Sequence, residues 1–220
     1  MPRGRRLLVA GGYYHVINRG NDRSVVFHDP AEYRSFLGLI AAAQERIRLD
    51  LLAFCLMPNH FHMVVSPHEQ GQVSRWMHWL LTTHTHRYHL RHGTSGRVWQ
   101  GRFKAFPIKH DGHLLTVLRY VERNALRSGL VDRAEKWCWG SLAWRLECDA
   151  GNLLSDLPIA LPRGWARLVN EPQTPAELES LRTCVNREQP FGDDPWVKQT
   201  AWRLSPETPA RPRGRPAKNR

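Results

Sequence analysis

Two histidines, His60 and His62, stand one residue apart in the apolar stretch LAFCLMPNHFHMVVSP at 52–67. Pro58-Asn59 separates two short apolar runs, which is typical of a tight hairpin connection, so a strand should begin at or near His60. Because strand side chains alternate between faces, both imidazoles should lie on one side of that strand. Two neighbouring neutral imidazoles in a buried sheet form a platform for a metal ion. They could equally be hydrogen-bonded core histidines, and this stretch alone leaves both interpretations open.

A second group, Tyr120 and Asn124, falls in a helix that Asp111 should cap. An apolar stripe with helical spacing should face the sheet, and it consists of Leu114, Val117, Leu118, Val121 and Ala125. Tyr120 lies off that stripe, on a polar flank rich in arginine. Asn124 follows one turn later on the same flank, so the hydroxyl and the amide could both point into one site.

The elements that would position these residues follow from periodicity and turn signals. Strands are predicted at 13–19, 51–57, 60–65 and 98–108, and helices at 30–48, 72–90 and from 111 onward. The tryptophan-rich segment WCWGSLAW should pack over the edge of the domain. Residues 148–170 should form a connector with little regular structure, and residues 171–205 a small helical accessory region with helices at 175–187 and 195–204.

Another histidine pair, His84 and His86, lies in the helix predicted at 72–90. On a helix, positions two apart point in different directions, so this pair should not share a metal ion. We expect it to face solvent or nucleic acid.

The balance of charge favours a polyanionic partner. The 220 residues carry 32 Lys and Arg against 20 Asp and Glu, a formal net charge of +12, and the pI is near 10.3. Such values are typical of nucleic-acid binding. The basic residues are spread along the chain, and no run approaches the ~20 apolar residues of a membrane span, so a membrane is not the expected partner.

The four cysteines form no CxxC pair, which indicates reduced thiols, and the apolar run near the start is too short for a signal peptide. We therefore expect a cytoplasmic protein. The tail at 206–220 is rich in Pro and Arg and should lack fixed structure in isolation. Its Arg213-Gly214-Arg215 resembles an AT-hook, which binds the minor groove of A·T-rich DNA.

Four motifs resemble the single-tyrosine HUH transposases, and most of all the REP-associated tyrosine transposases. In chain order they are YHVINRGN at 14–21, LMPNHFHMVV at 56–65, VWQGRF at 98–103 and LRYVERNALRSGLV at 118–131. The resemblance covers roughly 12–147. It implies an α+β fold for an HUH nuclease domain at 1–147, with a ferredoxin-like antiparallel sheet and helices on one face.

The same resemblance implies roles for the residues above. His60 and His62 would bind a divalent metal, Mg²⁺ or Mn²⁺, with Asn124 as third ligand, and Tyr120 would be the nucleophile. Its attack on single-stranded, hairpin-bearing DNA would leave a 5′-phosphotyrosine and a free 3′-hydroxyl, a step that another 3′-hydroxyl can reverse. The protein would act as a monomer or homodimer. Candidates for contacts with the DNA backbone are Arg19, Arg102, Lys104, Arg119, Arg123 and Arg127, with Arg213 and Arg215 in the tail.

Two other functions stay open. A non-catalytic DNA- or RNA-binding protein derived from such a transposase would bind through its basic surface and have an empty or misshapen metal site. A zinc hydrolase would use His60 and His62 with water as the nucleophile, but the sequence offers no evident third His or carboxylate at ligand spacing.

Overall fold

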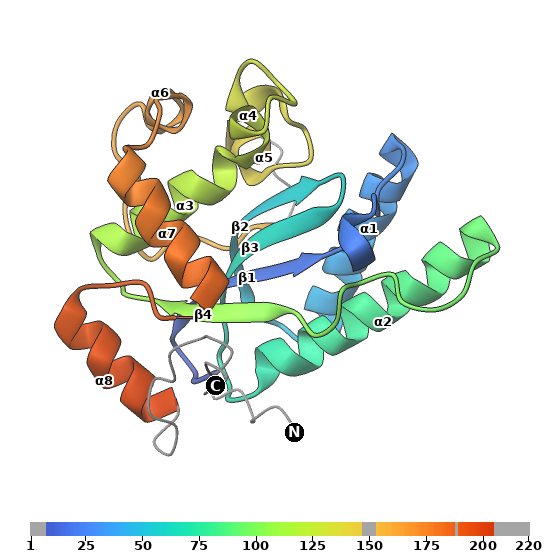
Figure 1. Cartoon of the computed structure of the whole chain (residues 1–220), viewed down its shortest axis with the longest axis horizontal. Coiled ribbons are helices and arrows are strands. Elements are labelled where there is room, and N and C mark those ends of the chain that lie inside the picture. The colour runs from blue at the N-terminus through green and yellow to red at the C-terminus, as the bar shows by residue number, and fades with distance from the viewer. Residues whose placement is uncertain (1–7, 147–152, 188, 205–220) are drawn as a thin grey trace, which may run out of the picture.

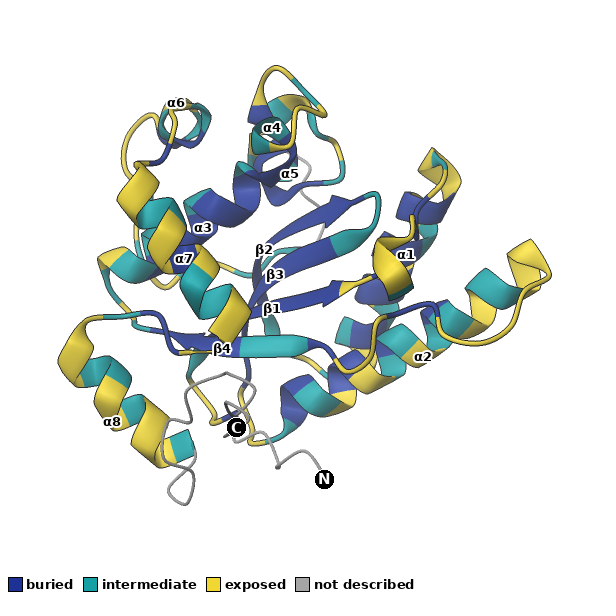
Figure 2. Ribbon diagram, in the orientation of Figure 1, coloured by how far each residue is buried: buried dark blue, intermediate teal, exposed yellow. Residues whose placement is uncertain are grey.

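The structure, a computed structural model, describes residues 8–146, 153–187 and 189–204. Within these residues, four strands form an antiparallel sheet in the order β2-β3-β1-β4. They are β1 (Tyr13–Arg19), β2 (Asp50–Met57), β3 (His60–Ser66) and β4 (Lys104–Ile108). The turn between β2 and β3 is Pro58-Asn59, as predicted. The strands are mostly buried (Figure 2), because helices cover both faces of the sheet.

The helices α1 (Pro30–Arg46) and α2 (Gln72–His92) cover one face (Figure 1). Asp29 caps α1 by accepting hydrogen bonds from the backbone N–H groups of Ala31 and Glu32. Large side chains of both helices pack on those of the sheet, and the cluster includes Phe36, Ile40, Phe54, Phe61, Trp76 and Leu80. The succession β1-α1-β2-β3-α2-β4 with this strand order is the predicted ferredoxin-like arrangement.

The helix α3 (Gly112–Glu122) and the short α4 (Asn124–Arg127) lie over the opposite face. Asp111 caps α3, accepting a hydrogen bond of 2.8 Å from the backbone N–H of His113. The predicted apolar stripe of α3 packs on Cys55, Val64 and neighbouring side chains. Helices therefore lie on both faces of the sheet, not on one as expected.

The chain after α4 folds back onto the same structure. The tryptophan-rich segment packs along β2, as expected: the Trp137 indole donates to the Leu56 carbonyl, and the Leu56 N–H donates to the Trp139 carbonyl. The 3-10 turn η2 (Ala134–Lys136) precedes this segment, and α5 (Ser141–Leu146) begins within it. The helix α6 (Trp165–Asn170) buries Trp165 and Val169, so the stretch predicted to be an irregular connector contains a packed helix.

The last two described helices are α7 (Pro175–Arg187) and α8 (Asp194–Leu204), close to their expected positions. Between them, Phe191 exchanges backbone hydrogen bonds with the edge strand β4, donating to the Pro107 carbonyl and accepting from the Lys109 N–H. These bonds tie the accessory region to the sheet.

Two further expectations were wrong. The strand predicted at 98–108 begins only at Lys104, because residues 98–103 form a loop in which Gly101 adopts a φ of 139°. His84 does not face solvent or nucleic acid: it is 5% exposed and packs on Phe36 and Trp99. No helix in the described parts of the chain is both long and apolar enough to cross a membrane.

Candidate active site

Three imidazoles lie together on the face of the sheet that α3 covers. His60 and His62 project from β3, and His15 joins them from the neighbouring strand β1. The Nε2 atom of His15 is 2.9 Å from the Nδ1 atom of His62, and the ring centroids of His60 and His62 are 5.1 Å apart. His15 and His62 are buried, whereas His60 is half-buried. The predicted pair is therefore part of a cluster that reaches solvent at His60.

All three rings are held in the neutral form. Burial and the charge of Arg127 lower the pKa of His15 to about 3, and burial, Arg19 and Arg127 lower that of His60 to about 4. Burial and the other two imidazoles hold the pKa of His62 well below its usual range. Neutral imidazole is the form that binds a metal ion, so at pH 7 the cluster needs no deprotonation before binding one.

The turn before β3 orients His60. The Nδ1 atom of His60 is 2.6 Å from the Oδ1 atom of Asn59, whose Nδ2 donates to the Arg23 carbonyl at 3.0 Å. The loop after β1, which includes the 3-10 turn η1 (Asn21–Arg23), is hydrogen-bonded to the same turn. The Gly20 N–H donates to the Asn59 carbonyl at 2.8 Å. A Cβ atom on Gly20 would collide with the Ser24 carbonyl oxygen. This close approach requires glycine and fixes the start of β3.

Tyr120 approaches the histidines from α3. Its ring centroid lies 5.7 Å from that of His62 and 5.9 Å from that of His15. The side chain is 6% exposed, so Tyr120 is buried among imidazoles and does not stand on an open polar flank. The tyrosine and the histidines that it contacts belong to the same chain.

Asn124 and Arg127 follow Tyr120 after a slight irregularity at Arg123, which separates α3 from α4. Asn124 is 1% exposed, and its amide nitrogen has no hydrogen-bond partner among the described residues. The guanidinium carbon of Arg127 lies 4.0 Å from the centroid of the Tyr120 ring, and one of its nitrogens is buried without a partner. Unsatisfied buried polar groups are rare and often mark a place where another group binds.

The predicted DNA contacts divide into two sets. In the strand register, Arg19 of β1 lies opposite His60 of β3, and Lys104 of β4 lies opposite Ile17 of β1. Both basic residues therefore lie on the face of the sheet that carries the histidines. Arg102 is exposed in the loop before β4. Arg213 and Arg215 lie outside the described residues.

Arg119 and Arg123 are engaged within the protein. Arg119 donates to the Leu168, Glu171 and Pro172 carbonyls, and Arg123 to the Val169 and Asn170 carbonyls. Their guanidinium groups thus cap the C-terminal end of α6 and hold it against α3, where positive charge is favourable.

A buried carboxylate, Glu122, anchors the end of α3. It is 3% exposed and accepts hydrogen bonds from Ser141 (2.7 Å), Arg145 (2.8 Å) and the Trp165 indole (2.6 Å). These donors come from α5 and α6, so three helices converge on one carboxylate. The network fixes the helix that carries Tyr120.

His15 was not among the residues predicted from sequence. Its position within YYHVINR places it on one face with Tyr13, Ile17 and Arg19, by strand alternation. His15 meets His62 only if β1 lies next to β3 in the sheet, and the sequence alone does not show this order. The strand order is therefore the missing signal.

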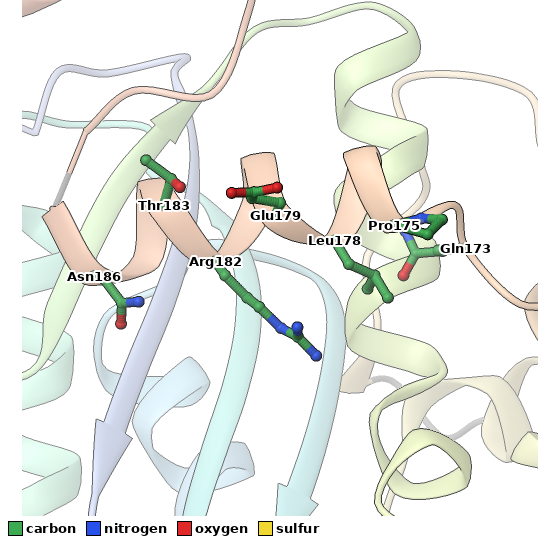
Figure 3. A pocket seen from close by; sticks show the side chains of 7 residues that line it. All are labelled: Gln173, Pro175, Leu178, Glu179, Arg182, Thr183 and Asn186. Carbon is green, nitrogen blue, oxygen red and sulfur yellow. The ribbon is translucent and has the colours of Figure 1, made fainter.

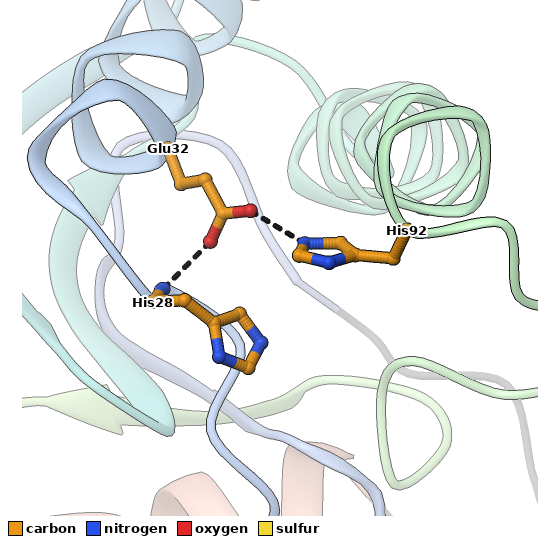
Figure 4. Close-up of side chains that lie close together, drawn as sticks. All are labelled: His28, Glu32 and His92. Carbon is orange, nitrogen blue, oxygen red and sulfur yellow. Dashed lines mark hydrogen bonds and ion pairs between the residues drawn. The ribbon is translucent and has the colours of Figure 1, made fainter.

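A different group of side chains has metal-ligand types. Among the described residues, only His28, Glu32 and His92 form a trio of His, Cys, Asp or Glu ligand atoms within 4.8 Å of one another (Figure 4). The Glu32 carboxylate already accepts from the His28 backbone N–H at 2.6 Å, and it contacts His92 at 2.6 Å and Arg91 at 3.2 Å. These contacts cap α1 and join it to α2, so they account for the placement of Glu32. His15, His60 and His62 do not form such a trio, so the three-ligand site of a zinc hydrolase is not formed there.

A surface depression of about 560 Å³ runs along α7 (Figure 3). It is lined by Gln173, Pro175, Leu178, Glu179, Arg182, Thr183 and Asn186. None of these is a candidate active-site residue, and acidic and basic side chains are both present, so the depression defines no ligand class.

The strand order and the helices on the two faces define a ferredoxin-like α+β protein in which a tyrosine helix lies over a pair of histidines. The chain belongs to the family described as "Transposase IS200 like", which matches residues 9–124. It is 23% identical over 154 residues to a Haemophilus influenzae protein provisionally named a REP-associated tyrosine transposase, covering 64% of this chain and 85% of that protein. Among solved structures it is similar to a REP-associated tyrosine transposase bound to a REP hairpin, with a TM-score of 0.57 and 19% identity. That match covers 72% of this chain and 96% of the other, and it supports the fold.

Proposed function

We propose that this protein is a metal-dependent tyrosine nuclease and strand transferase that acts on single-stranded, hairpin-bearing DNA. The observation that carries the proposal is the position of the Tyr120 ring, 5.7 Å from the His62 ring centroid in the same chain. A nucleophile and a pair of metal-binding imidazoles on one face of a sheet are the parts that such a reaction needs.

The residues present fit a divalent cation. His60 and His62 are neutral, and Asn124 is a buried amide whose carbonyl oxygen is the atom that could bind the ion. These three side chains would hold the ion, and mixed nitrogen and oxygen ligands suit Mg²⁺ or Mn²⁺. When bound, the ion would withdraw electrons from a non-bridging oxygen of the scissile phosphate.

Tyr120 supplies the nucleophile. Its Oη atom attacks the phosphorus, the Oη–P bond forms and the P–O3′ bond breaks. The phenol proton leaves to solvent or a nearby base, and the departing 3′ oxygen is protonated. The 5′-phosphotyrosine keeps one phosphodiester linkage, so a 3′-hydroxyl from another strand can reverse the reaction and join new ends.

Positive charge beside the site supports a DNA substrate. Arg19 lies next to His60, and Arg127 covers the face of Tyr120 with a buried nitrogen that has no partner in the described chain. Guanidinium groups bind phosphate through paired N–H donors. A hairpin-bearing substrate is proposed by analogy, because the similar solved transposase is bound to a REP hairpin.

The test uses 5′- and 3′-labelled hairpin-bearing single-stranded DNA, with Mg²⁺ or Mn²⁺ and with EDTA. The expected product is a metal-dependent covalent adduct that resists denaturing electrophoresis, and Tyr120→Phe should abolish it. His60→Ala should also abolish it while leaving Tyr120 in place. An adduct that persists in Tyr120→Phe would contradict the assignment of the nucleophile. Tight DNA binding without any adduct would leave a DNA-binding protein, which is the alternative function.

A further inference from the structure

The two histidines of the proposed metal site share one feature: the Nδ1 atom of each ring is already occupied. His60 Nδ1 is 2.6 Å from the Oδ1 atom of Asn59, and His62 Nδ1 is 2.9 Å from the Nε2 atom of His15. The partners come from different elements, the β2–β3 turn and strand β1. In both rings, the nitrogen left to bind an ion is therefore Nε2.

The hydrogen-bond network determines the tautomer of His60. Asn59 must direct its NH₂ group to the Arg23 carbonyl, because a carbonyl can only accept. Its Oδ1 atom then faces His60 and can only accept as well. His60 must carry its proton on Nδ1, so its Nε2 presents a lone pair.

The contact between His15 and His62 allows two arrangements, since either ring could donate. If His15 Nε2 donated, His62 would carry its proton on Nε2 and could not bind an ion through that atom. If His62 Nδ1 donates, its Nε2 lone pair is open, matching His60. We infer that His15 is a positioning residue: it accepts the Nδ1–H of His62 and, together with Asn59, fixes both histidines with Nε2 open to a metal ion. This inference rests on the proposed function for the identity of the two ligands.

His15 is placed rigidly enough for such a role. Its side chain is 1% exposed, and its ring lies edge-on to Phe106 at 5.1 Å and stacks on His62 at 5.1 Å. Strand pairing places His15 opposite Val64, diagonally next to His62. A residue that accepts the hydrogen bond of the other ring nitrogen orients a metal-binding imidazole and raises its basicity. Loss of such a residue typically lowers metal affinity by about 10- to 100-fold.

The first test needs no metal and no activity, and it reads the tautomers in the wild-type protein. Long-range ¹H–¹⁵N correlation spectra of the metal-free protein, with His60→Gln and His62→Gln spectra for assignment, report which nitrogen of each ring carries the proton. We expect the Nδ1–H tautomer for both His60 and His62. An Nε2–H tautomer for His62 would overturn the inference about His15.

The second test measures Mn²⁺ affinity by electron paramagnetic resonance for two variants of His15. His15→Phe keeps an aromatic ring but cannot accept the hydrogen bond from His62. His15→Gln can still accept it through its amide oxygen. We expect His15→Phe to weaken Mn²⁺ binding by about 10- to 100-fold and His15→Gln to stay within about 3-fold of wild type. The matched control is Tyr14→Phe, which removes a hydroxyl from the same strand on the opposite face and should leave the affinity unchanged. Wild-type affinity in His15→Phe would contradict the inference.

The two hypotheses fail in different ways. If His60→Ala binds Mn²⁺ as well as wild type does, the proposed metal site is wrong. If His60→Ala loses binding but His15→Phe does not, the metal site stands and the role of His15 is refuted. Thermal unfolding in EDTA checks that each variant is folded. If a variant does not fold, the tautomer of His62 in the wild-type protein decides whether the inference about His15 holds.

Discussion

The guanidinium carbon of Arg127 lies 4.0 Å from the centroid of the Tyr120 ring, although Arg127 comes about two helical turns later in the chain. This stacking holds the ring against the histidines and keeps a positive charge beside the phenol. Replacing Arg127 by Met retains the length and removes the charge. We predict a drop of about 10- to 100-fold in covalent adduct formation, because a cation over an aromatic face contributes about 0.5–2 kcal/mol and a phosphate partner would also be lost. Arg127→Lys should be intermediate, since an ammonium lacks the planar fork. Adduct formation at the wild-type rate in Arg127→Met would show that this charge has no part in the reaction.

Glu122 should be among the most sensitive positions for stability. Glu122→Gln keeps the size but leaves Arg145 without a counter-charge in a buried network, and its NH₂ group cannot accept from Arg145 or from the Trp165 indole, whichever of the two it faces. Removing one partner of a buried ion pair costs about 3–5 kcal/mol, so we expect a loss near that range in urea unfolding. Glu69→Gln is the matched control, because its pair with Arg75 is exposed and should change stability by under ~1 kcal/mol. Equal effects of the two substitutions would contradict this reading of the network.

Stability should fall in mild acid because His84 is buried. Burial lowers its pKa from 6.5 in the unfolded chain to about 4 in the folded protein. The unfolded state therefore binds the proton first, and the stability present above pH 6.5 is lost as the pH falls towards 4. In His84→Phe, the loss of unfolding free energy between pH 7 and pH 5 should be about 2 kcal/mol smaller than in wild type. His86→Phe, at an exposed position of the same helix, is the control. An identical pH dependence in wild type and His84→Phe would rule out His84 as the cause.

Two glycines should respond to alanine in opposite directions. Gly20→Ala should destabilise the protein by about 1–3 kcal/mol, because the new methyl group would overlap with the Ser24 carbonyl and Val26 where the loop grips the β2–β3 turn. Gly38→Ala, inside α1 with nothing near the added methyl group, should stabilise it by up to about 1 kcal/mol. Chemical denaturation of both variants measures the difference. Stabilisation by Gly20→Ala would mean that the loop is free to move away from the turn.

Local signals in the sequence were sufficient for most of the fold. Alternating apolar residues predicted β1, Asp29-Pro30 predicted the start of α1, and Pro58-Asn59 predicted the hairpin that places His60 and His62 on one face. Each of these features depends on residues close together in the chain. Residues 98–103 carry strand-like residues but form a loop, because Gly101 takes a backbone conformation that a strand cannot adopt.

The remaining features depend on contacts between distant segments. His15 meets His62 only because β1 lies between β3 and β4, and periodicity does not determine that order. Tyr120 was expected on a polar flank because its helical neighbours include Arg123 and Arg127. In the structure, Arg123 turns to α6 and Arg127 lies over the ring, so the phenol is enclosed. The burial of His84 likewise results from Phe36 and Trp99, which come from other parts of the chain.

The support of α3 by later segments bears on where this protein could be shortened. The family match ends at residue 124, yet the donors to Glu122 come from Ser141, Arg145 and Trp165, and the acceptors for Arg119 and Arg123 lie at 168–172. A gene fragment trimmed to the matched region would leave a carboxylate and two guanidinium groups without their partners, directly beside the tyrosine. The family match thus covers less of the chain than the hydrogen-bonded unit around α3, and a shortened version should retain at least the segment through α6.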